Sequence, residues 1–371
     1  MASSQESGGA LPPGIAGPGA LVGGKLRIER LLGVGGMGAV LAARHLHLDR
    51  LVAVKFLLPG LARDPQIVAR FLREARAASR IRGEHIARVL DVGTLDDGTP
   101  YIVMDLLDGE DVDRLLARQG KLPIAQAVDI VLEACVALAE AHAEGVVHRD
   151  LKPSNLFVTA AGVKVLDFGI SKLRGEEVDG SLTRTSSMIG SPLYMSPEQL
   201  RAAKDVDART DIWALGVIAY ELLAGARPFE GATIAEIGAA VFTKTPVPLR
   251  TLRPEVPAEL AFVIDTCLEK EREQRFASVA ELAFQIAPFG TQRAARALER
   301  VASFASRLPP PARAPRASAV KTHDGLTAAA RAPREPAGRA VAIAAVAIAL
   351  VAATAIAGVY AVRKRVRAVT T

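Results

Sequence analysis

The chain has 371 residues, half of them hydrophobic, which is too apolar for a mainly disordered protein and enough for one large or two modest domains. The formal net charge is +6, but residues 289–371 hold 14 lysines and arginines against 3 acidic residues, so the first 288 residues carry −5. Two cysteines far apart in helical patterns, Cys135 and Cys267, exclude a disulfide framework and a CxxC zinc site. Such cysteine usage favours a reducing compartment.

The order of predicted elements indicates two lobes. Residues 1–24 are rich in glycine, proline, serine and alanine, which predicts a disordered segment. One helical run at 65–81 then interrupts short β-type runs at 26–32, 40–44, 51–57, 86–92 and 101–105. Beyond residue 111 a hairpin at 156–165 interrupts helical runs at 123–143, 210–224, 234–242, 258–269 and 278–286. This order predicts an α+β fold with a β-rich lobe, a mainly helical lobe and a ligand in the cleft between them.

The C-terminal part is predicted to be a linker and a membrane anchor. Residues 289–339 are rich in alanine, proline and arginine, which predicts a basic linker. Within it, residues 291–308 have the spacing of a short basic helix, which either packs on the preceding lobe or lies on a membrane surface; packing is favoured. Residues 340–362 carry no charge over 23 positions, long enough to span a bilayer, and a short basic tail follows at 363–371.

A glycine-rich string follows the first predicted strand of the β-rich lobe. Gly33, Gly35, Gly36, Gly38 and Val40 form a GxGxxGxV pattern, which alone is weak because dinucleotide-binding folds use a similar string. The dinucleotide fold requires a helix directly after the glycines, whereas this sequence continues as a second strand. A β-turn whose backbone N–H groups lie over phosphates fits better.

A lysine and a glutamate form the second candidate pair. Lys55 lies on a strand that is otherwise suited to burial, and a buried lysine is rare unless it is paired. Glu74, on the helix 19 residues later, is the candidate partner. The alternative interpretation, an exposed strand lysine and an ordinary helix glutamate, loses weight because of the next motif.

The third motif contains the groups that phosphoryl transfer requires. It consists of His148-Arg149-Asp150-Leu151-Lys152-Pro153-Ser154-Asn155, followed by Asp167-Phe168-Gly169. The Asp150 carboxylate is placed to accept the proton of an incoming hydroxyl, while Asn155 and Asp167 offer oxygen ligands to the Mg²⁺ that bridges the phosphates. Lys152 offsets negative charge on the phosphoryl group during transfer.

With these motifs in order over residues 26 to 288, the chain resembles a bacterial, eukaryotic-like (Hanks-type) serine/threonine protein kinase. The resemblance implies the two-lobed kinase fold for residues 25–288, ATP and Mg²⁺ as cofactors, and non-specific serine/threonine protein kinase activity. The ATP-binding residues that it implies are Leu32, Gly33, Gly35, Gly36, Gly38, Val40, Ala53, Lys55, Glu74, Met104, Asp105 and Leu107. It also implies structural roles for Arg149, Glu198, Asp211 and Arg275.

Residues 190–198 resemble a peptide-docking segment, which small-molecule kinases of the same fold generally lack. The resemblance pairs Glu198 with Arg275 and uses Asp211 to anchor the catalytic loop from a central helix. The expected substrates are therefore proteins, of unknown identity. Three positions depart from the usual pattern, and none removes a catalytic group: Ser191, Ser196 and Asp105.

Residues 181–187 form a hydroxyl-rich stretch that is either a solvated loop or a regulatory one. Arg149 offers a guanidinium suited to bidentate phosphate binding, and a phosphate adds nearly two negative charges that order such a loop. The resemblance aligns Thr183 and Thr185 with autophosphorylated threonines. We therefore expect autophosphorylation in trans, with a second copy of the chain as partner.

The kinase domain is expected to face the cytoplasm, where ATP is found, with residues 340–362 crossing the bacterial cytoplasmic membrane once. Four basic residues within 363–367 favour the opposite orientation under the positive-inside rule. A large domain without a secretory signal does not cross readily, so we expect the tail outside. The helix has a small-xxx-small pair, Thr354 and Gly358, which is either a dimerisation surface or, as favoured, plain lipid-facing packing. No nucleic-acid partner is expected, because the basic tail has no aromatic or groove-reading elements.

Two alternatives belong to other functional classes. A catalytically silent nucleotide-binding scaffold should lack Lys55, Asp150 or Asp167, and all three are present. A small-molecule kinase conflicts with the docking segment at 190–198.

Overall fold

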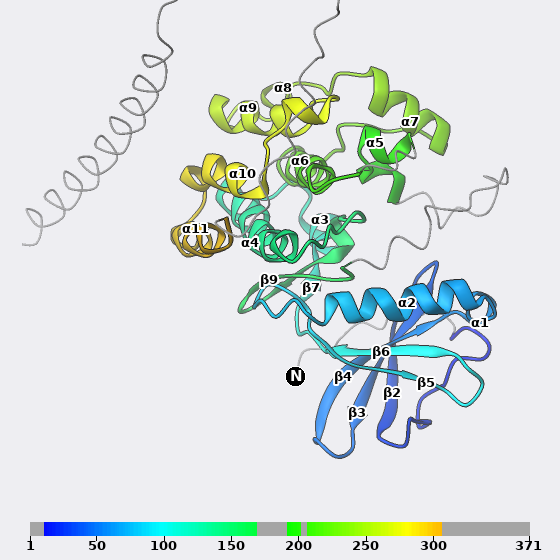
Figure 1. Ribbon diagram of the computed structural model, residues 1–371. Coiled ribbons are helices and arrows are strands. Elements are labelled where there is room, and N and C mark those ends of the chain that lie inside the picture. The colour runs from blue at the N-terminus through cyan, green and yellow to red at the C-terminus, as the bar shows by residue number, and fades with distance from the viewer. Residues whose placement is uncertain (1–10, 169–190, 202–205, 306–371) are drawn as a thin grey trace, which may run out of the picture. The chain divides into compact units, whose positions relative to one another are not determined.

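The computed structural model describes residues 11–168, 191–201 and 206–305 (Figure 1). These residues belong to a compact unit, Met1–Ala312, and the chain's second unit is Arg313–Thr371. The predicted phosphorylation sites Thr183 and Thr185 and the predicted helix at 340–362 lie outside the described residues. Among the helices in the described ranges, none combines the length and apolar character that crossing a membrane requires.

An antiparallel sheet of six strands forms the N-terminal lobe, in the order β1-β2-β3-β4-β6-β5. Its strands are β1 (Leu21–Val22), β2 (Leu26–Val34), β3 (Gly38–His45), β4 (Arg50–Leu57), β5 (Val89–Thr94) and β6 (Pro100–Asp105). Strand β4 is buried over its last six residues, because both faces of the sheet are covered. The β-rich lobe predicted from the sequence is confirmed.

One face of this sheet is covered by the helices α1 (Pro59–Ala62) and α2 (Pro65–Ala78), as Figure 1 shows for α2. The Asp64 carboxylate caps α2 by accepting hydrogen bonds from the N–H groups of Gln66 and Ile67, and Pro65 occupies the first turn, where its missing N–H is not needed. Phe71 and Ala75 on α2 are buried against the strands. This packing fixes the position of α2, the helix that carries Glu74, on the sheet.

The opposite face of the sheet is covered by residues 11–24, where composition predicted disorder. Ile15 and Val22 are buried in one core cluster with Tyr101. The Gly19 N–H donates to the Ile28 carbonyl at 2.8 Å, and a Cβ on Gly23, whose φ is 53°, would lie 2.4 Å from the Tyr101 hydroxyl oxygen. A few apolar side chains with an apolar face to cover are enough to order this segment, and average composition does not reveal them.

The C-terminal lobe is mainly helical and holds a small sheet of three strands, β7 (Glu110–Asp111), β8 (Leu156–Thr159) and β9 (Gly162–Val165). Its helices are α3 (Val112–Gln119), α4 (Ile124–Ala143), α5 (Pro197–Leu200), α6 (Arg209–Ala224), α7 (Ile234–Thr243), α8 (Leu249–Leu252), α9 (Ala258–Cys267), α10 (Val279–Ile286) and α11 (Gln292–Ala305). Short 3₁₀ turns lie at η1 (Pro153–Asn155), η4 (Ser191–Tyr194), η5 (Arg272–Gln274) and η6 (Ala287–Phe289). The predicted hairpin at 156–165 is confirmed as β8 and β9.

Helices α4 and α6 form the centre of this lobe and are buried on nearly every side. On α6 the Trp213 ring stacks on Phe229 with centroids 5.5 Å apart. A helix that is apolar on all faces is typical of a core helix in a large domain. The two helices therefore give a rigid base to the loops at their ends.

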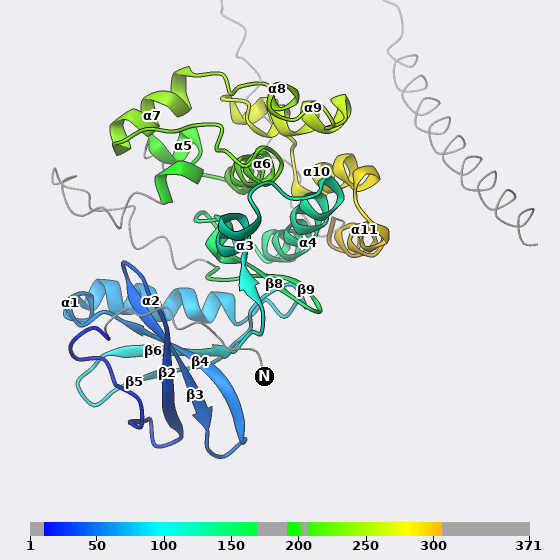
Figure 2. The ribbon, with the colours of Figure 1, turned by 180° about the vertical axis from the view of Figure 1, so that it is seen from behind.

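The loop between α2 and β5 attaches the β-rich lobe to the helical lobe beside β9 (Figure 2). The Ala87 N–H donates to the Val165 carbonyl at 3.1 Å, and the Val165 N–H donates to the His85 carbonyl at 2.8 Å. The Glu140 carboxylate on α4 accepts from the Arg82 N–H at 3.0 Å. These bonds fix the end of α2 relative to β9, whose next residues lead to Asp167.

Helix α11 extends the helical lobe beyond the predicted boundary at residue 288. Ala294, Ala297 and Val301 are buried against the same core as α4. The Asp129 carboxylate on α4 accepts from the Thr291 N–H at 2.9 Å and from its hydroxyl at 2.6 Å, immediately before α11. The linker predicted to begin at 289 therefore starts with an ordered helix, and its packing on the preceding lobe is as favoured from the sequence.

Replacing Val301, whose side chain is fully buried in α11, tests this packing. Val301→Ala is expected to lower the free energy of unfolding by about 2 kcal/mol, because it removes buried methyl groups and leaves a cavity. The measurement is urea unfolding, with Glu299→Ala on the exposed face of the same helix as control and an expected change within about 0.5 kcal/mol. Equal effects of the two substitutions would show that α11 does not pack on α4.

Candidate active site

The glycine-rich string forms the turn between β2 and β3. The Gly35 N–H donates to the Gly38 carbonyl at 2.8 Å, which closes the turn. A Cβ on Gly38 would lie 2.3 Å from the Phe56 carbonyl oxygen, so only glycine allows β3 to approach β4 this closely. The chain continues as strand β3 and not as a helix, which contradicts the dinucleotide-binding alternative. Leu32 and Val40 flank the turn and are partly buried.

Lys55 pairs with Asp167 in the structure. This residue lies on β4 and is 8% exposed, and its Nζ is 2.7 Å from Asp167 Oδ1. Burial disfavours the charged form of Asp167, but the Lys55 ammonium outweighs it, and the pKa of this carboxyl lies below its ordinary value. The backbone of Glu74 lies in α2, but its side chain is outside the described part of the structure, so the Lys55–Glu74 pair stays a prediction.

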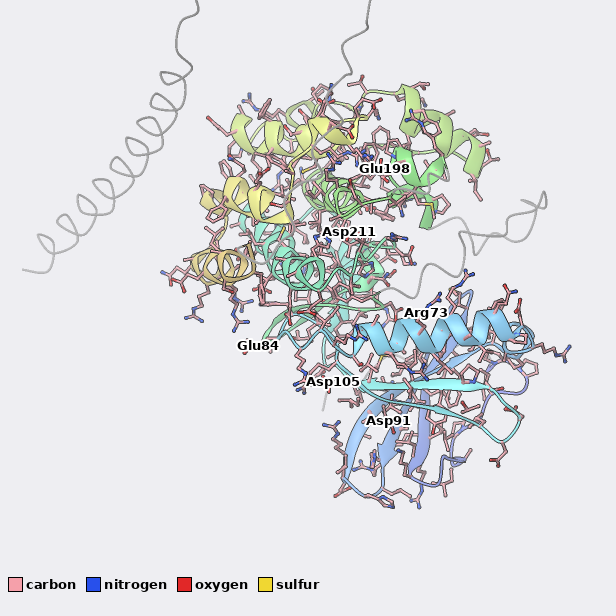
Figure 3. All side chains as sticks on the ribbon, viewed as in Figure 1. Arg73, Glu84, Asp91, Asp105, Glu198 and Asp211 are labelled. Atoms are coloured by element: carbon pink, nitrogen blue, oxygen red, sulfur yellow. The ribbon has the colours of Figure 1, made fainter. Side chains whose placement is uncertain are left out.

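Three of the predicted ATP-binding residues lie at the end of β6 or just after it. Met104 is opposite Ala53 of β4 in the sheet, and Leu107 follows the strand, partly buried. Asp105 accepts a hydrogen bond from Arg88 Nε at 3.0 Å, and Figure 3 shows it where β6 leaves the sheet. This ion pair joins the ends of β5 and β6 beside the connection to the helical lobe.

The predicted catalytic loop, residues 148–155, brings Asp150, Lys152 and Asn155 together. Lys152 Nζ lies 3.0 Å from Asp150 Oδ2, and both side chains are 25% exposed. The side-chain amide of Asn155 donates to the backbone carbonyl of Asp150 at 2.7 Å. The backbone carbonyl of Asn155 accepts from the Leu166 N–H at 2.9 Å. The loop is thus bonded directly to the segment that carries Asp167.

Two residues of this region have positive φ angles that side chains rarely adopt. Arg149 has a φ of 65° and Asp167 a φ of 58°. Such left-handed conformations persist in residues other than glycine only where surrounding contacts enforce them, and they are frequent at active sites. Here the enforcing contacts include a hydrogen bond between the His148 ring and the Leu166 carbonyl at 2.8 Å and an edge contact of that ring with Phe168.

Asp211 anchors the predicted catalytic loop to helix α6. It lies in the first turn of α6, where the helix dipole favours a negative charge, and is 1% exposed. Its carboxylate accepts from the N–H groups of His148 and Arg149, each at 2.9 Å, and lies 2.8 Å from the ring nitrogen Nε2 of His142. Burial opposes its ionisation, but these contacts hold the pKa of Asp211 below its ordinary value. No motif or spacing signal marks His142 in the sequence.

The predicted docking segment is fixed to the lobe by a buried ion pair, and the residue that follows it is bonded to the predicted catalytic loop by its amide. Arg275 is 5% exposed, and its two terminal nitrogens lie 2.8 and 2.9 Å from the Glu198 carboxylate oxygens. Gln199 Nε2 donates to the Arg149 carbonyl at 2.7 Å. Figure 3 shows Glu198 on α5 and Asp211 on α6 within the helical lobe. Sequence reasoning missed Gln199, which has no recognisable motif of its own.

The Arg149 guanidinium donates to the Val206 carbonyl at 3.2 Å. Its predicted phosphate partners, Thr183 and Thr185, are outside the described residues, so the structure gives no contact between them.

Asn155 and Asp167 have the chemistry of Mg²⁺ ligands. The Asn155 side-chain nitrogen donates to the Asp150 carbonyl, which leaves the side-chain oxygen as an acceptor, and the Lys55 ammonium holds the pKa of Asp167 below its ordinary value. No group of three or more histidine, cysteine or acidic side chains suited to a metal occurs among the described residues. Two hard oxygen ligands, completed by phosphate oxygens and water, suit Mg²⁺ and not an all-protein metal cage.

The fold and this site define a class of protein. Residues 26–286 match the protein kinase domain family, and the chain belongs to that family. Its relatives include bacterial enzymes of the Hanks type. Serine/threonine-protein kinase pkn3 of Myxococcus xanthus is 43% identical over 62% of this chain, and serine/threonine-protein kinase PknB of Mycobacterium leprae is 38% identical over 68%.

A solved structure is also similar. The PknI kinase domain of Mycobacterium tuberculosis is 31% identical, covers 76% of this chain and 100% of its own, and has a TM-score of 0.57. The chain spans 43% of the length of pkn3 and 41% of that of PknB. The likeness is therefore to the kinase domains of these relatives.

Proposed function

We propose that the chain is an ATP- and Mg²⁺-dependent serine/threonine protein kinase that phosphorylates proteins and itself. The observation that carries the proposal is the joined arrangement of Asp150, Lys152 and Asn155 in one hydrogen-bonded loop, with Asp167 bonded to Lys55 beside it. A nucleotide-binding scaffold without catalysis is not favoured, because each of these groups is present.

The chain's own residues account for positioning and proton transfer. The Asp150 carboxylate accepts the proton of a serine or threonine hydroxyl, and Lys152, 3.0 Å away, offsets the negative charge of the phosphoryl group in transit. Lys55 and the N–H groups of the glycine-rich turn hold the phosphates. Asn155 and Asp167 would hold Mg²⁺, which neutralises phosphate charge when bound.

A phosphotransfer assay tests the activity. The full chain is incubated with ATP, Mg²⁺ and a generic basic protein, and phosphoserine or phosphothreonine on that protein is the expected product. If no phosphoprotein forms, even when Thr183 and Thr185 are replaced by glutamate, the nucleotide-binding scaffold would be favoured.

The chain is further proposed to autophosphorylate Thr183 and Thr185 in trans and to gain activity by it. Thr183→Ala with Thr185→Ala is expected to lower the rate roughly tenfold, equivalent to the loss of about one charge-assisted hydrogen bond from the ordered loop. Mass spectrometry of the loop and the phosphotransfer rate are the measurements, with Ser186→Ala and Ser187→Ala as the control. Full activity with an unphosphorylated loop would contradict this regulation.

The uncharged segment 340–362 supports single-pass anchoring in the cytoplasmic membrane, with the kinase domain in the cytoplasm. The expected result is that the full chain stays with bacterial membranes through alkaline carbonate extraction. Deletion of 340–362 should release it, whereas deletion of the tail 363–371 should not. A full chain that leaves the membranes on extraction would rule the anchor out.

A further inference from the structure

A pocket of about 440 Å³ lies beside the docking segment, apart from the ATP-binding residues. It is lined by Leu193, Arg227, Glu230, Gly231 and Ala232. Leu193 belongs to η4, and the other residues belong to the loop between α6 and α7. None of these five residues has a role in the phosphoryl transfer proposed above.

A hydrogen-bond network holds the walls of the pocket in place. The Tyr194 hydroxyl donates to Glu221 Oε2 at 2.7 Å, and Arg227 Nε donates to Glu221 Oε1 at 3.0 Å. The Glu221 side chain is 12% exposed and lies on α6, a core helix. Both walls, η4 and the α6–α7 loop, are therefore bound to one rigid carboxylate, which makes the pocket a fixed feature of the lobe.

The same segment ties the pocket to the catalytic loop. The Ser196 hydroxyl caps α5, and Gln199 in that helix donates to the carbonyl of Arg149, the residue before Asp150. Because η4 and α5 follow one another without a break, a polypeptide that brings a hydroxyl to Asp150 along this segment has the pocket beside it. The pocket is thus placed to read a side chain of a protein substrate.

The charges around the pocket favour a cation. Arg227 forms an ion pair with Glu221 and also interacts electrostatically with the exposed Glu230, so two carboxylates share one guanidinium. Glu236, which accepts from the Ala232 N–H at 2.9 Å, adds a further negative charge at the rim. Leu193 and Ala232 supply an apolar wall beside these carboxylates. A lysine or arginine side chain has both an apolar stem and a cationic head.

We propose that this pocket binds a lysine or arginine side chain of the protein substrate and that Glu230 is the specificity-determining residue. The proposal rests on the proposed kinase function. It defines one class of substrate: proteins with a basic residue near the phosphorylated hydroxyl.

The test uses the full chain in detergent with serine peptides that each carry one arginine at a different position within six residues of the serine. The expected result is that one such peptide gains about fivefold in kcat/KM over its glutamine counterpart, the scale of one partly exposed ion pair. Glu230→Gln should remove that gain, and Glu230→Lys should reverse it in favour of a peptide with aspartate at the same position. Glu255→Gln, an exposed carboxylate on another loop, is the matched control and should keep the gain.

A second readout keeps this test separate from that of the kinase activity. Binding of the same peptides, with alanine in place of serine, is measured by fluorescence anisotropy and needs no phosphoryl transfer. If no phosphoryl transfer is detected but the arginine peptide binds in a way that depends on Glu230, the kinase function would be overturned and the proposed role of the pocket supported. Equal binding of the arginine and glutamine peptides would overturn the proposed role of the pocket. The same would follow if Glu230→Gln left the preference for the arginine peptide unchanged.

Discussion

Asp150→Asn is expected to lower kcat for protein phosphorylation by about 10²–10⁴. The amide keeps the size of the side chain but cannot accept the hydroxyl proton. The residue is only partly buried, and its contact with Lys152 is that of a partly exposed ion pair, so the free energy of unfolding should change by less than about 1 kcal/mol. The KM for ATP should stay close to that of the unmodified chain, because the residues predicted to bind ATP lie on β2, β3, β4, α2 and β6 and just after β6.

The measurements are the phosphotransfer rate at saturating ATP and urea unfolding of the same preparations. Asp96→Asn, on the exposed turn between β5 and β6, is the matched control and should keep full activity. More than a tenth of the original rate in folded Asp150→Asn protein would contradict the proton-accepting role.

Arg275→Met is expected to give the largest loss of stability, about 3–5 kcal/mol. The substitution leaves the Glu198 carboxylate buried without its partner. It also removes the donor of hydrogen bonds to the carbonyls of Glu269, Arg209 and Lys270. Urea unfolding measures the loss. Arg44→Met, which breaks the ion pairs with Glu29 and Asp49 on the exposed sheet surface, is the control and should cost at most about 1 kcal/mol.

The pH dependence of stability gives a second view of the same pair. Burial raises the pKa of Glu198, but Arg275 outweighs it, so the pKa lies below its ordinary value of 4.5. A carboxyl with a lowered pKa in the folded state contributes stability above its ordinary pKa, and this is lost as the pH falls below it. The unmodified chain should therefore lose stability below about pH 4.5, and Arg275→Met should lose this part of the dependence. A variant as stable as Arg44→Met, with unchanged acid sensitivity, would show that the pair does not hold the docking segment.

The kinase fold was predictable because its motifs combine residue type with order along the chain. The glycine-rich turn, Lys55 and the loop from His148 to Asn155 each depend on local chemistry that a sequence displays directly. Periodicity also located the main helices and the β8–β9 hairpin. Asp150, Lys152 and Asn155 lie within six residues, so their proximity follows from one loop conformation.

Contacts between distant residues were harder to predict. His142 meets Asp211 across 69 positions, and Gln199 meets Arg149 across 50, and neither pair has a spacing that a single sequence reveals. The order of the segment at 11–24 was hidden by composition, because glycine and proline dominate the average while a few apolar side chains decide the packing. The spacing within 291–308, in contrast, did predict the helix at 292–305. Sequence patterns report elements, and tertiary packing decides which weak elements become ordered.

The segment at 11–24 has a consequence for how two copies of this chain can meet. It occupies the outer face of the β-rich lobe, where Ile15 and Val22 fill the surface above Val54 and Tyr101. A second molecule cannot stack its sheet on that face without first peeling the segment away and exposing these side chains to water. The encounters proposed for phosphorylation in trans would therefore have to engage the covering segment itself or other surfaces of the chain.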